Sequence, residues 1–253
     1  MMSNDRVETI LNHLKLHNLV TVEELVEVTG ASPSTIRREL AKLTRKGTIS
    51  RVHGGATLNR YIPIQTPVTE KAVTRHQDKA LIGKKAASLI KEGDCIILDA
   101  GTTTMEIARN IPNIPLTVFT PDLNIALVLS ELPLVDVIVT GGHIDKTTKS
   151  CSGDDTKQYF ERINPNIVFL ACNAWIDESP GVSTPSYSKV IIKKSILKRH
   201  AKKVLVVDSS KYGATSLYKI CDIDDLDMVI TDKGLPDDVC EALKKRGIIM
   251  LRV

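Results

Sequence analysis

The sequence predicts an α/β protein in two parts, a small and mainly helical N-terminal unit followed by a larger, mostly parallel α/β body. In the first 46 residues, apolar side chains recur at three- and four-residue spacing, which is the period of a helix. From residue 78 onward, continuous Val/Ile/Leu runs alternate with helical patterns, as in a parallel sheet covered on both faces. The 253 residues, 42% of them hydrophobic, supply enough apolar material for two domains.

The first two helices are short and amphipathic. Residues 5–17 place their apolar side chains on one helical face. Thr21 then stands three residues before Glu24, which is the signature of a capping box, in which two residues satisfy each other's backbone N–H groups. We therefore expect a second helix that follows Thr21 and continues to about Val28.

The third helix has the residue types that DNA recognition requires. Ser32 and Pro33 are typical start residues, and the helix extends from Ser34 to about Lys46. One face is apolar, and the opposite face is hydroxylic near its start and basic after it. Arginine can donate two hydrogen bonds to a guanine edge, while lysine and hydroxyl groups hold phosphates. The expected DNA contacts from this helix and its cap are Ser32, Ser34, Thr35, Arg37, Arg38, Lys42 and Arg45.

A β-hairpin is expected after the third helix. Apolar and polar residues alternate through TISRVHGGATL, and the turn falls at Gly54-Gly55. The hairpin would be the wing of a winged helix-turn-helix and would place Arg51 and His53 near a phosphate backbone. Thr21, at the start of the second helix, completes the candidate DNA contacts. The alternative is a three-helix protein-interaction module whose basic face is only solvated.

Charge is concentrated in this N-terminal unit. Residues 29–60 hold seven Lys/Arg and one acid, a net charge of +6, whereas the whole chain carries +4, so the remainder sums to −2. A basic segment on a slightly acidic body is typical of a protein that binds a polyanion.

No apolar run approaches the roughly 20 residues of a membrane helix, and the N-terminus lacks a signal-peptide pattern. Five separated cysteines without a CxxC pair favour reduced thiols over disulfides or a metal site, and we expect a cytoplasmic protein.

The body is expected to alternate strands with helices, without internal repeats. The predicted strands are 95–100, 116–120, 135–140, 166–171, 203–208, 227–231 and 248–252. The predicted helices are 78–91, 103–110, 122–131, 154–163, 188–200 and 236–246. Between Leu58 and Thr74 the periodicity is lost and two prolines occur, which is the composition of a connector. The expected division is residues 1–58 for the winged helix-turn-helix, 59–75 for a linker and 76–253 for the α/β domain.

Polar turns after the strands are the candidate small-molecule site, because ligands of parallel sheets bind beyond the carboxyl ends of the strands. In DAGTTTMEIA, Gly101 permits a tight turn, and three threonines bring hydroxyl and N–H groups to a helix start that suits a phosphate. Further polar turns are FTPDLNIA, TGGHID and VDSSKYG, the last with a lysine that can neutralise an anion. The candidate ligand-binding residues are Asp99, Gly101, Thr102, Thr103, Thr104, Asp122, Gly141, Gly142 and Lys211.

Both parts of the chain resemble the DeoR family of bacterial transcription regulators. Over residues 5–57, VTVEELVEVTGASPSTIRRELAKLTRKGTISRVHGGA is similar to the family's DNA-binding signature, with TIRREL and RVHGGA at the usual separation. Over residues 75–253, LDAGTTT, LTVFT followed by LNIA, TGG, DSSKYG and VITD are similar to its C-terminal sensor domain. The resemblance implies a sensor similar to ribose-5-phosphate isomerase that binds phosphorylated sugars, with the 101–104 turn on the phosphate and Lys211 assisting.

The resemblance also implies a function. It implies a repressor of carbohydrate catabolic genes, released from double-stranded operator DNA by a phosphorylated sugar-type effector, with no enzymatic activity and no cofactor. A homo-oligomer is expected, because a single DNA-binding unit gives little specificity and paired half-sites are usual.

Two departures from the family pattern concern the ligand. Pro121-Asp122 stands where the family commonly has asparagine, and ACNAWIDESPG replaces a turn that contains glycine and aspartate. The family usually has an acidic residue near the start of the next helix, here predicted at 188–200. In this chain Ser188 or Lys189 stands in its place. The loss of carboxylates and the gain of a lysine favour a more anionic ligand, such as a phosphorylated acid sugar.

Two other function classes compete with the regulator. A sugar isomerase fused to a winged helix needs a positioned acid–base group, and residues 172–189 offer little beyond Asp177 and Glu178. A dinucleotide-binding redox repressor needs GxGxxG after its first strand, whereas the turn here is AGTTTM. Cys172 has no positioned base and is expected to be a buried thiol.

Overall fold

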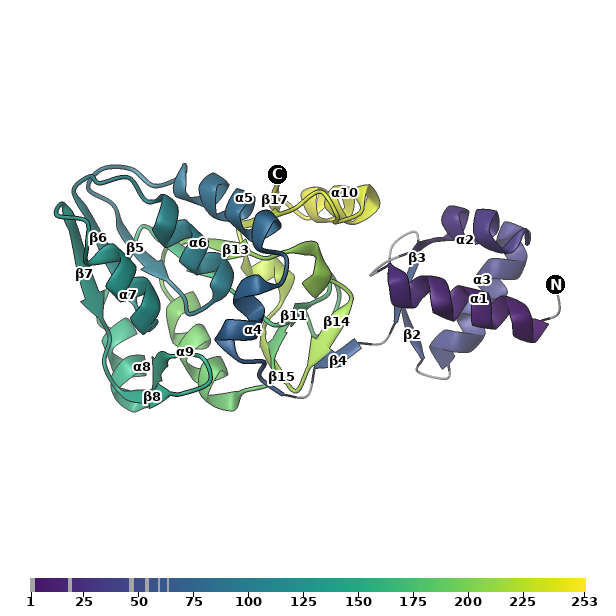
Figure 1. The fold of residues 1–253 in the computed structure, drawn as a ribbon, viewed down its shortest axis with the longest axis horizontal. Helices are drawn as coiled ribbons and strands as arrows, with labels where there is room; N and C mark the ends of the chain where they lie inside the picture. The colour runs from purple at the N-terminus through teal and green to yellow at the C-terminus, as the bar shows by residue number, and fades with distance from the viewer. Residues whose placement is uncertain (1–2, 18–19, 46–47, 53–54, 59, 63) are drawn as a thin grey trace.

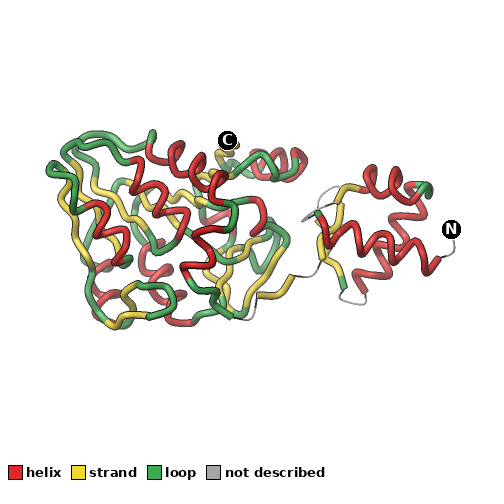
Figure 2. Tube along the Cα trace, viewed as in Figure 1, coloured by secondary structure: helices red, strands yellow, loops and turns green. Residues whose placement is uncertain are grey.

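The computed structural model describes the chain except for residues 1–2, 18–19, 46–47, 53–54, 59 and 63. Figure 1 shows a small N-terminal unit, which comprises the residues up to Leu58, beside a larger α/β body that comprises the rest. In Figure 2 the N-terminal unit is mostly helical, whereas the body mixes helices with strands throughout. No helix in the described ranges is long and apolar enough to cross a membrane.

The N-terminal unit is a winged helix-turn-helix, as the sequence predicts. Its elements are α1 (Ser3–Leu16), β1 (Val20–Thr21), α2 (Val22–Thr29), α3 (Pro33–Arg45), β2 (Ile49–Val52) and β3 (Gly55–Leu58). The expected capping box is present, because the Glu24 N–H donates to the Thr21 hydroxyl at 3.1 Å and the Thr21 N–H donates to the Glu24 carboxylate at 2.7 Å. The three strands form a small antiparallel sheet in the order β1-β3-β2.

A separate apolar core holds this unit together. Ile10 from α1, Leu25 from α2, and Ile36 and Leu40 from α3 are fully buried against one another. These are positions that the three- and four-residue spacing assigns to the inner faces. Burying such side chains stabilises the fold by roughly 1.5–3 kcal/mol each, so the unit has a core that is independent of the body.

The body is built on a parallel sheet of seven strands among the described residues. The strands are β5 (Cys95–Leu98), β6 (Leu116–Thr120), β7 (Val135–Val139), β10 (Ile167–Leu170), β13 (Lys202–Val206), β16 (Met228–Thr231) and β17 (Ile249–Arg252). Their order is β17-β16-β13-β10-β5-β6-β7, and every neighbouring pair is parallel. All seven correspond to predicted strands, which confirms the mostly parallel α/β class.

Helices cover both faces of the sheet. They are α5 (His76–Ala87), α6 (Thr102–Asn110), α7 (Leu123–Leu129), α8 (Asp154–Phe160), α9 (Tyr187–Leu197) and α10 (Asp237–Lys245). Successive strand residues point to opposite faces, so Ile96 joins the core under α5, α6 and α7, whereas Ile97 packs against α8 and α9. The helix α10 covers the same face as α9, over the strands at the other end of the sheet.

Short strands outside the main sheet escaped prediction. The sheet β11-β12-β15 consists of β11 (Ala174–Trp175), β12 (Val182–Thr184) and β15 (Tyr218–Cys221), and β8 (His143–Asp145) pairs with β9 (Ser150–Ser152). Strands of two to four residues contain at most two repeats of the two-residue strand pattern, which is too few for periodicity to detect them.

The segment expected to be a linker, residues 59–75, contains a strand and a helix. The strand β4 (Arg60–Ile62) pairs in parallel with β14 (Ala214–Ser216) of the body, and α4 (Val68–Val73) follows it. The Ser216 hydroxyl also donates to the Ile62 carbonyl at 2.6 Å. The connecting segment is therefore fastened to the body by backbone pairing, which its proline-containing sequence does not reveal.

Candidate nucleic-acid interface and anion pocket

The helix α3 presents a polar, basic face to solvent. Ile36, Leu40 and Leu43 are buried, whereas the polar side chains Ser34, Arg37, Arg38, Lys42 and Arg45 are exposed. Helical spacing in the sequence places Ser34, Arg38, Lys42 and Arg45 on the outward face and Arg37 on its flank. The arrangement provides four cationic groups on one side of the helix, which suits contact with base edges and phosphates.

Hydroxyl groups cluster where α3 begins. The Ser32 hydroxyl accepts the N–H of Thr35 at 3.3 Å, which makes Ser32 the expected cap. It also lies 3.0 Å from the Ser34 hydroxyl and 2.9 Å from the Thr35 hydroxyl. Three hydroxyl groups and the free N–H groups of a helix start form a surface that can bind a phosphate.

A buried carboxylate lies beneath the basic face of α3. Glu39 is buried, and its Oε1 lies 3.4 Å both from Arg6 Nη2 and from Lys42 Nζ. Burial alone raises the pKa of Glu39, but the two cations outweigh burial and leave the pKa below its usual value. Because Glu39 stays ionised, it holds Lys42 in place on the surface.

Three further candidate DNA contacts differ in their surroundings. Arg51 on β2 is exposed, at the position expected for the wing. The Thr21 hydroxyl is engaged in capping α2. His53 lies outside the described residues.

A pocket opens where β5, β10 and β13 end. Its floor is formed by the turns that follow these strands, at 100–103, 171–173 and 207–208. Five lysines line it, together with the carboxylate of Asp208: Lys71, Lys79, Lys189, Lys193 and Lys211. A site with so many ammonium groups at the carboxyl edge of a parallel sheet is suited to an anion.

Residues 101–103 of the predicted 101–104 turn form part of the floor of this pocket. Gly101, Thr102 and Thr103 line it at the start of α6. A Cβ at Gly101 would lie 2.9 Å from the Ala171 Cβ, so close packing requires glycine there. Thr104 is fully buried and donates its hydroxyl to the Gly101 carbonyl at 2.8 Å. Thr104 therefore shapes the turn and does not face the pocket.

Three of the five lysines have partners within the protein. Lys193 donates to the carboxylate of Asp99 and to the Ala171 carbonyl, the latter at 2.7 Å. Lys189 donates to the Ser150 hydroxyl, and its Nζ lies 3.5 Å from the Asp145 carboxylate. Asp99 thus holds a lysine at the pocket and is not itself part of the lining.

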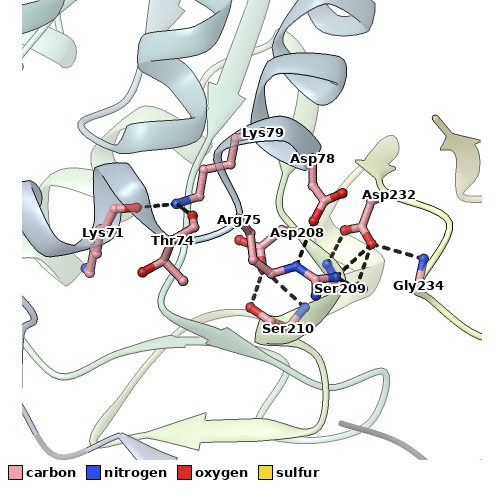
Figure 3. Close-up of polar contacts among 10 residues, drawn as sticks. All are labelled: Lys71, Thr74, Arg75, Asp78, Lys79, Asp208, Ser209, Ser210, Asp232 and Gly234. Atoms are coloured by element: carbon pink, nitrogen blue, oxygen red, sulfur yellow. Dashed lines mark hydrogen bonds and ion pairs between the residues drawn. The ribbon is translucent and has the colours of Figure 1, made fainter. Parts of the chain in front are cut away.

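The third partnered lysine, Lys79, holds the end of α4. Its Nζ donates to the backbone carbonyls of Lys71 and Thr74, the latter at 2.7 Å. Figure 3 shows this side chain extending from α5 to the C-terminal end of α4. Its role is to join the two helices as well as to add charge to the pocket.

Lys71 and Lys211 have no ion pair within the described part of the chain. Burial, together with the positive charges of Lys211, Lys193 and Lys79, lowers the pKa of Lys71 to about 8. A bound anion would relieve this repulsion. The two lysines are therefore the groups most available to a ligand.

Some predicted ligand residues are not among those that line this pocket. Asp122 caps α7 by accepting the N–H of Asn124 at 2.9 Å, and burial raises its pKa to about 6 despite that bond. The Gly141 carbonyl accepts the Thr156 hydroxyl at 2.6 Å, and Gly142 packs against the same hydroxyl. These three residues support turns in the structure and do not line the pocket.

Several pocket residues were not found from the sequence. Lys71 is missed because the segment before α5 reads as a connector, and Lys79 and Lys193 are missed because they stand within predicted helices. The four-residue spacing of Lys189 and Lys193 was the available signal, since it places both on one face of α9.

Cys172 also lines the pocket, and burial raises the pKa of its thiol to about 12. The described residues contain no cluster of His, Cys, Asp and Glu that could hold a metal ion.

Comparison with known proteins gives matches to both parts of the chain. The family model of the DeoR-like helix-turn-helix domain matches residues 6–61, and that of the DeoR C terminal sensor domain matches residues 74–233.

Relatives match over nearly the whole length. An uncharacterized HTH-type transcriptional regulator of Haemophilus influenzae is 35% identical over 100% of this chain and 98% of its own. The HTH-type transcriptional regulator YgbI of Escherichia coli K12 is 33% identical over 99% and 98% of the two chains. The HTH-type transcriptional repressor GlcR of Bacillus subtilis is 30% identical over 99% and 96%.

Solved structures resemble the chain more distantly. Ribose 5-phosphate isomerase A from Methanocaldococcus jannaschii has a TM-score of 0.41 at 14% identity, over 55% of each chain. The sorbitol operon regulator SorC from Klebsiella pneumoniae has a TM-score of 0.37 at 9% identity, over 83% of this chain and 96% of that chain. Likeness at this level says nothing about function.

Proposed function

Because the chain belongs to the DeoR family of DNA-binding transcriptional regulators, we propose that it represses a carbohydrate or acid-sugar catabolic operon. In this proposal the N-terminal unit binds operator DNA, and a phosphorylated sugar-type effector releases it by binding the pocket of the body. The observation that supports the effector class best is the group of lysines around the 101–104 turn.

A phosphate group fits the charges of this pocket. Five ammonium groups are met by three carboxylates, those of Asp208 in the lining and of Asp99 and Asp145 behind it. The surplus of two positive charges matches one phosphate dianion. The N–H groups at the start of α6 would add hydrogen bonds and a favourable helix dipole.

An acid sugar is included in the proposal because of Lys189. The family resemblance places an acidic residue at Lys189 or at its neighbour Ser188, and the ammonium group of Lys189 is buried in the pocket lining. Its partner Asp145 lies 3.5 Å away, which is longer than the shortest charge-assisted hydrogen bonds. A ligand carboxylate could therefore compete with Asp145 for Lys189.

We propose that the DNA contacts come from α3, its cap and the wing. Arg37, Arg38 and Arg45 offer guanidinium groups for base edges, and Lys42 with the hydroxyl cluster offers phosphate contacts. We further propose that the protein acts as a homo-oligomer, because paired units are needed to read paired half-sites.

The pocket does not favour the isomerase alternative. General acid–base catalysis needs a carboxylate or equivalent that can reach the substrate. Asp208 is the carboxylate in the lining, and it accepts the N–H of Ser210 at 3.1 Å and also the Ser210 hydroxyl. Asp208 thereby caps the short helix η1 (Ser209–Lys211). We propose that the ligand is sensed without being converted.

A thermal-shift screen of the full chain tests the effector class. Sugar phosphates, acid-sugar phosphates and the corresponding unphosphorylated sugars should be compared at equal concentration and ionic strength. Stabilisation by phosphorylated compounds alone supports the proposal, and a larger shift with acid-sugar phosphates supports the role of Lys189. Stabilisation by unphosphorylated sugars alone, or conversion of any pentose phosphate, would contradict it.

A further inference from the structure

We propose that the ligand is held between Lys71 and Lys211, and that it thereby fastens the strand pair β4·β14 that attaches the connecting segment to the body. The inference rests on the proposed effector pocket. It adds to that pocket a ligand contact from the connecting segment and a physical route from the ligand to the DNA-binding unit.

The two lysines stand on the two segments that form the strand pair. The chain runs from β4 into α4, which carries Lys71, whereas Lys211 ends η1 three residues before β14 begins. The strands pair in register from Arg60 with Ala214 to Ile62 with Ser216. A ligand that bridges the two ammonium groups therefore bridges the two segments at a second point.

Without an anion, the same two lysines oppose the strand pair. Neither has an ion pair in the described part of the chain, and the positive charge of Lys211 disfavours the charged form of Lys71. A phosphate dianion between them would replace this repulsion with two attractions. The ligand would then favour the paired arrangement of the segments, which is the differential binding that allosteric coupling requires.

The parts of both segments that lie away from β4·β14 are anchored to the body, as Figure 3 shows. Arg75, just after α4, donates to Asp78 at 2.8 Å, to Ser209 at 3.1 Å and to Asp232 at 3.3 Å. The Ser209 N–H in turn donates to Asp232 at 2.6 Å. Arg75 and Ser209 are thus fixed to the body. A displacement of Lys71 or Lys211 is therefore transmitted toward the strand pair β4·β14.

The segment after Lys211 reaches the wing directly. Gly213 has a φ of +73°, and a Cβ there would lie 2.6 Å from the Thr57 hydroxyl oxygen. Thr57 belongs to β3, the strand that pairs with β2 in the wing. A movement of residues 211–214 is therefore passed to the wing as well as to the connecting segment.

Hydrogen exchange of the full chain tests the inference with inorganic phosphate as the probe. The wild type should be compared in about 50 mM phosphate and in chloride of equal ionic strength. We expect phosphate to slow exchange in residues 99–104, 60–73 and 209–216, by about fivefold or more where local opening limits exchange. Lys71→Met should abolish the effect in 60–73 and 209–216, Lys71→Arg should retain it, and Lys91→Met, on an exposed lysine outside the pocket, should leave it unchanged.

The outcomes separate this inference from the proposed function. Protection of 99–104 without protection of 60–73 would overturn the bridge and leave the effector pocket in place. The bridge is equally overturned if Lys71→Met responds to phosphate as the wild type does. Absence of protection in all three segments of the wild type would overturn the proposed phosphate site, and the inference with it.

Discussion

Lys193 binds the carboxylate of Asp99 directly, and both side chains are buried, Lys193 in the pocket lining and Asp99 behind it. The same ammonium group donates to the Ala171 carbonyl, and the Ala171 N–H donates to Asp99 at 3.0 Å. The two side chains thus join the ends of β5 and β10, the strands whose turns form the pocket floor.

Asp99→Asn should destabilise the protein, because it leaves the buried Lys193 without a counter-charge. The expected loss is about 3 kcal/mol of unfolding free energy, measured by urea denaturation. Adding Lys193→Met should recover most of that loss, since the unpaired charge is removed. A double variant as unstable as Asp99→Asn would show that Asp99 acts through its bond to Ala171 and not through charge.

Arg38→Ala should weaken binding to the specific operator by about 1–3 kcal/mol if Arg38 contacts a base edge. Lys42→Ala is the matched control on the same face. It should weaken specific and non-specific DNA about equally and flatten the salt dependence, because phosphate contacts release counterions. Equal operator binding by the wild type and Arg38→Ala at low salt would contradict this orientation of α3.

Thr103→Ala combined with Lys211→Ala should abolish the ligand response while operator binding is retained. Both residues line the pocket in the body, whereas the proposed DNA contacts lie in the N-terminal unit. The measurement is operator affinity with and without the best compound from the thermal-shift screen. Release of the double variant at the wild-type ligand concentration would move the effector site elsewhere.

Ligand affinity should fall as the pH rises above about 8. The pKa of Lys71 lies near 8 in the free protein, and a bound anion favours the protonated form, so binding is linked to proton uptake. Phosphate esters are already dianionic between pH 7.5 and 9.5, since their second pKa is about 6. Calorimetric titrations over that range should show a decline in the wild type that is absent in Lys71→Met. A flat profile in the wild type would exclude Lys71 as a contact.

The sequence predicted the large elements well because each has enough residues to show a period. The run CIILDA is continuous and apolar because β5 is buried on both faces, and the capping pair Thr21 and Glu24 marks the start of α2. The strand β4 and the helix α4 were missed because they have only three and six residues, with prolines between them, and so show no measurable pattern. Strand pairing with residues 214–216 depends on the folded body, which local sequence does not encode.

The candidate site was predicted in part for a similar reason. Ligands of parallel sheets bind beyond the carboxyl ends of the strands. This rule located the 101–104 turn and Lys211, because both stand in segments that follow strands of the sheet. The same rule selected Gly141 and Gly142, which instead pack against Thr156. The lysines from α4, α5 and α9 come from helices that fold back over the sheet edge, and their convergence is a property of tertiary packing.

The attachment of β4 and α4 to the body determines where this regulator can be recombined with others. A chimera joined at residue 75 would carry a foreign Gln65, Thr66 and Lys71 into the ligand pocket and would lose the native partner of β14. A chimera joined just after Leu58 would exchange DNA specificity and keep every residue that lines the ligand pocket. The natural splice point for engineered sensors of this type therefore lies between the wing and β4.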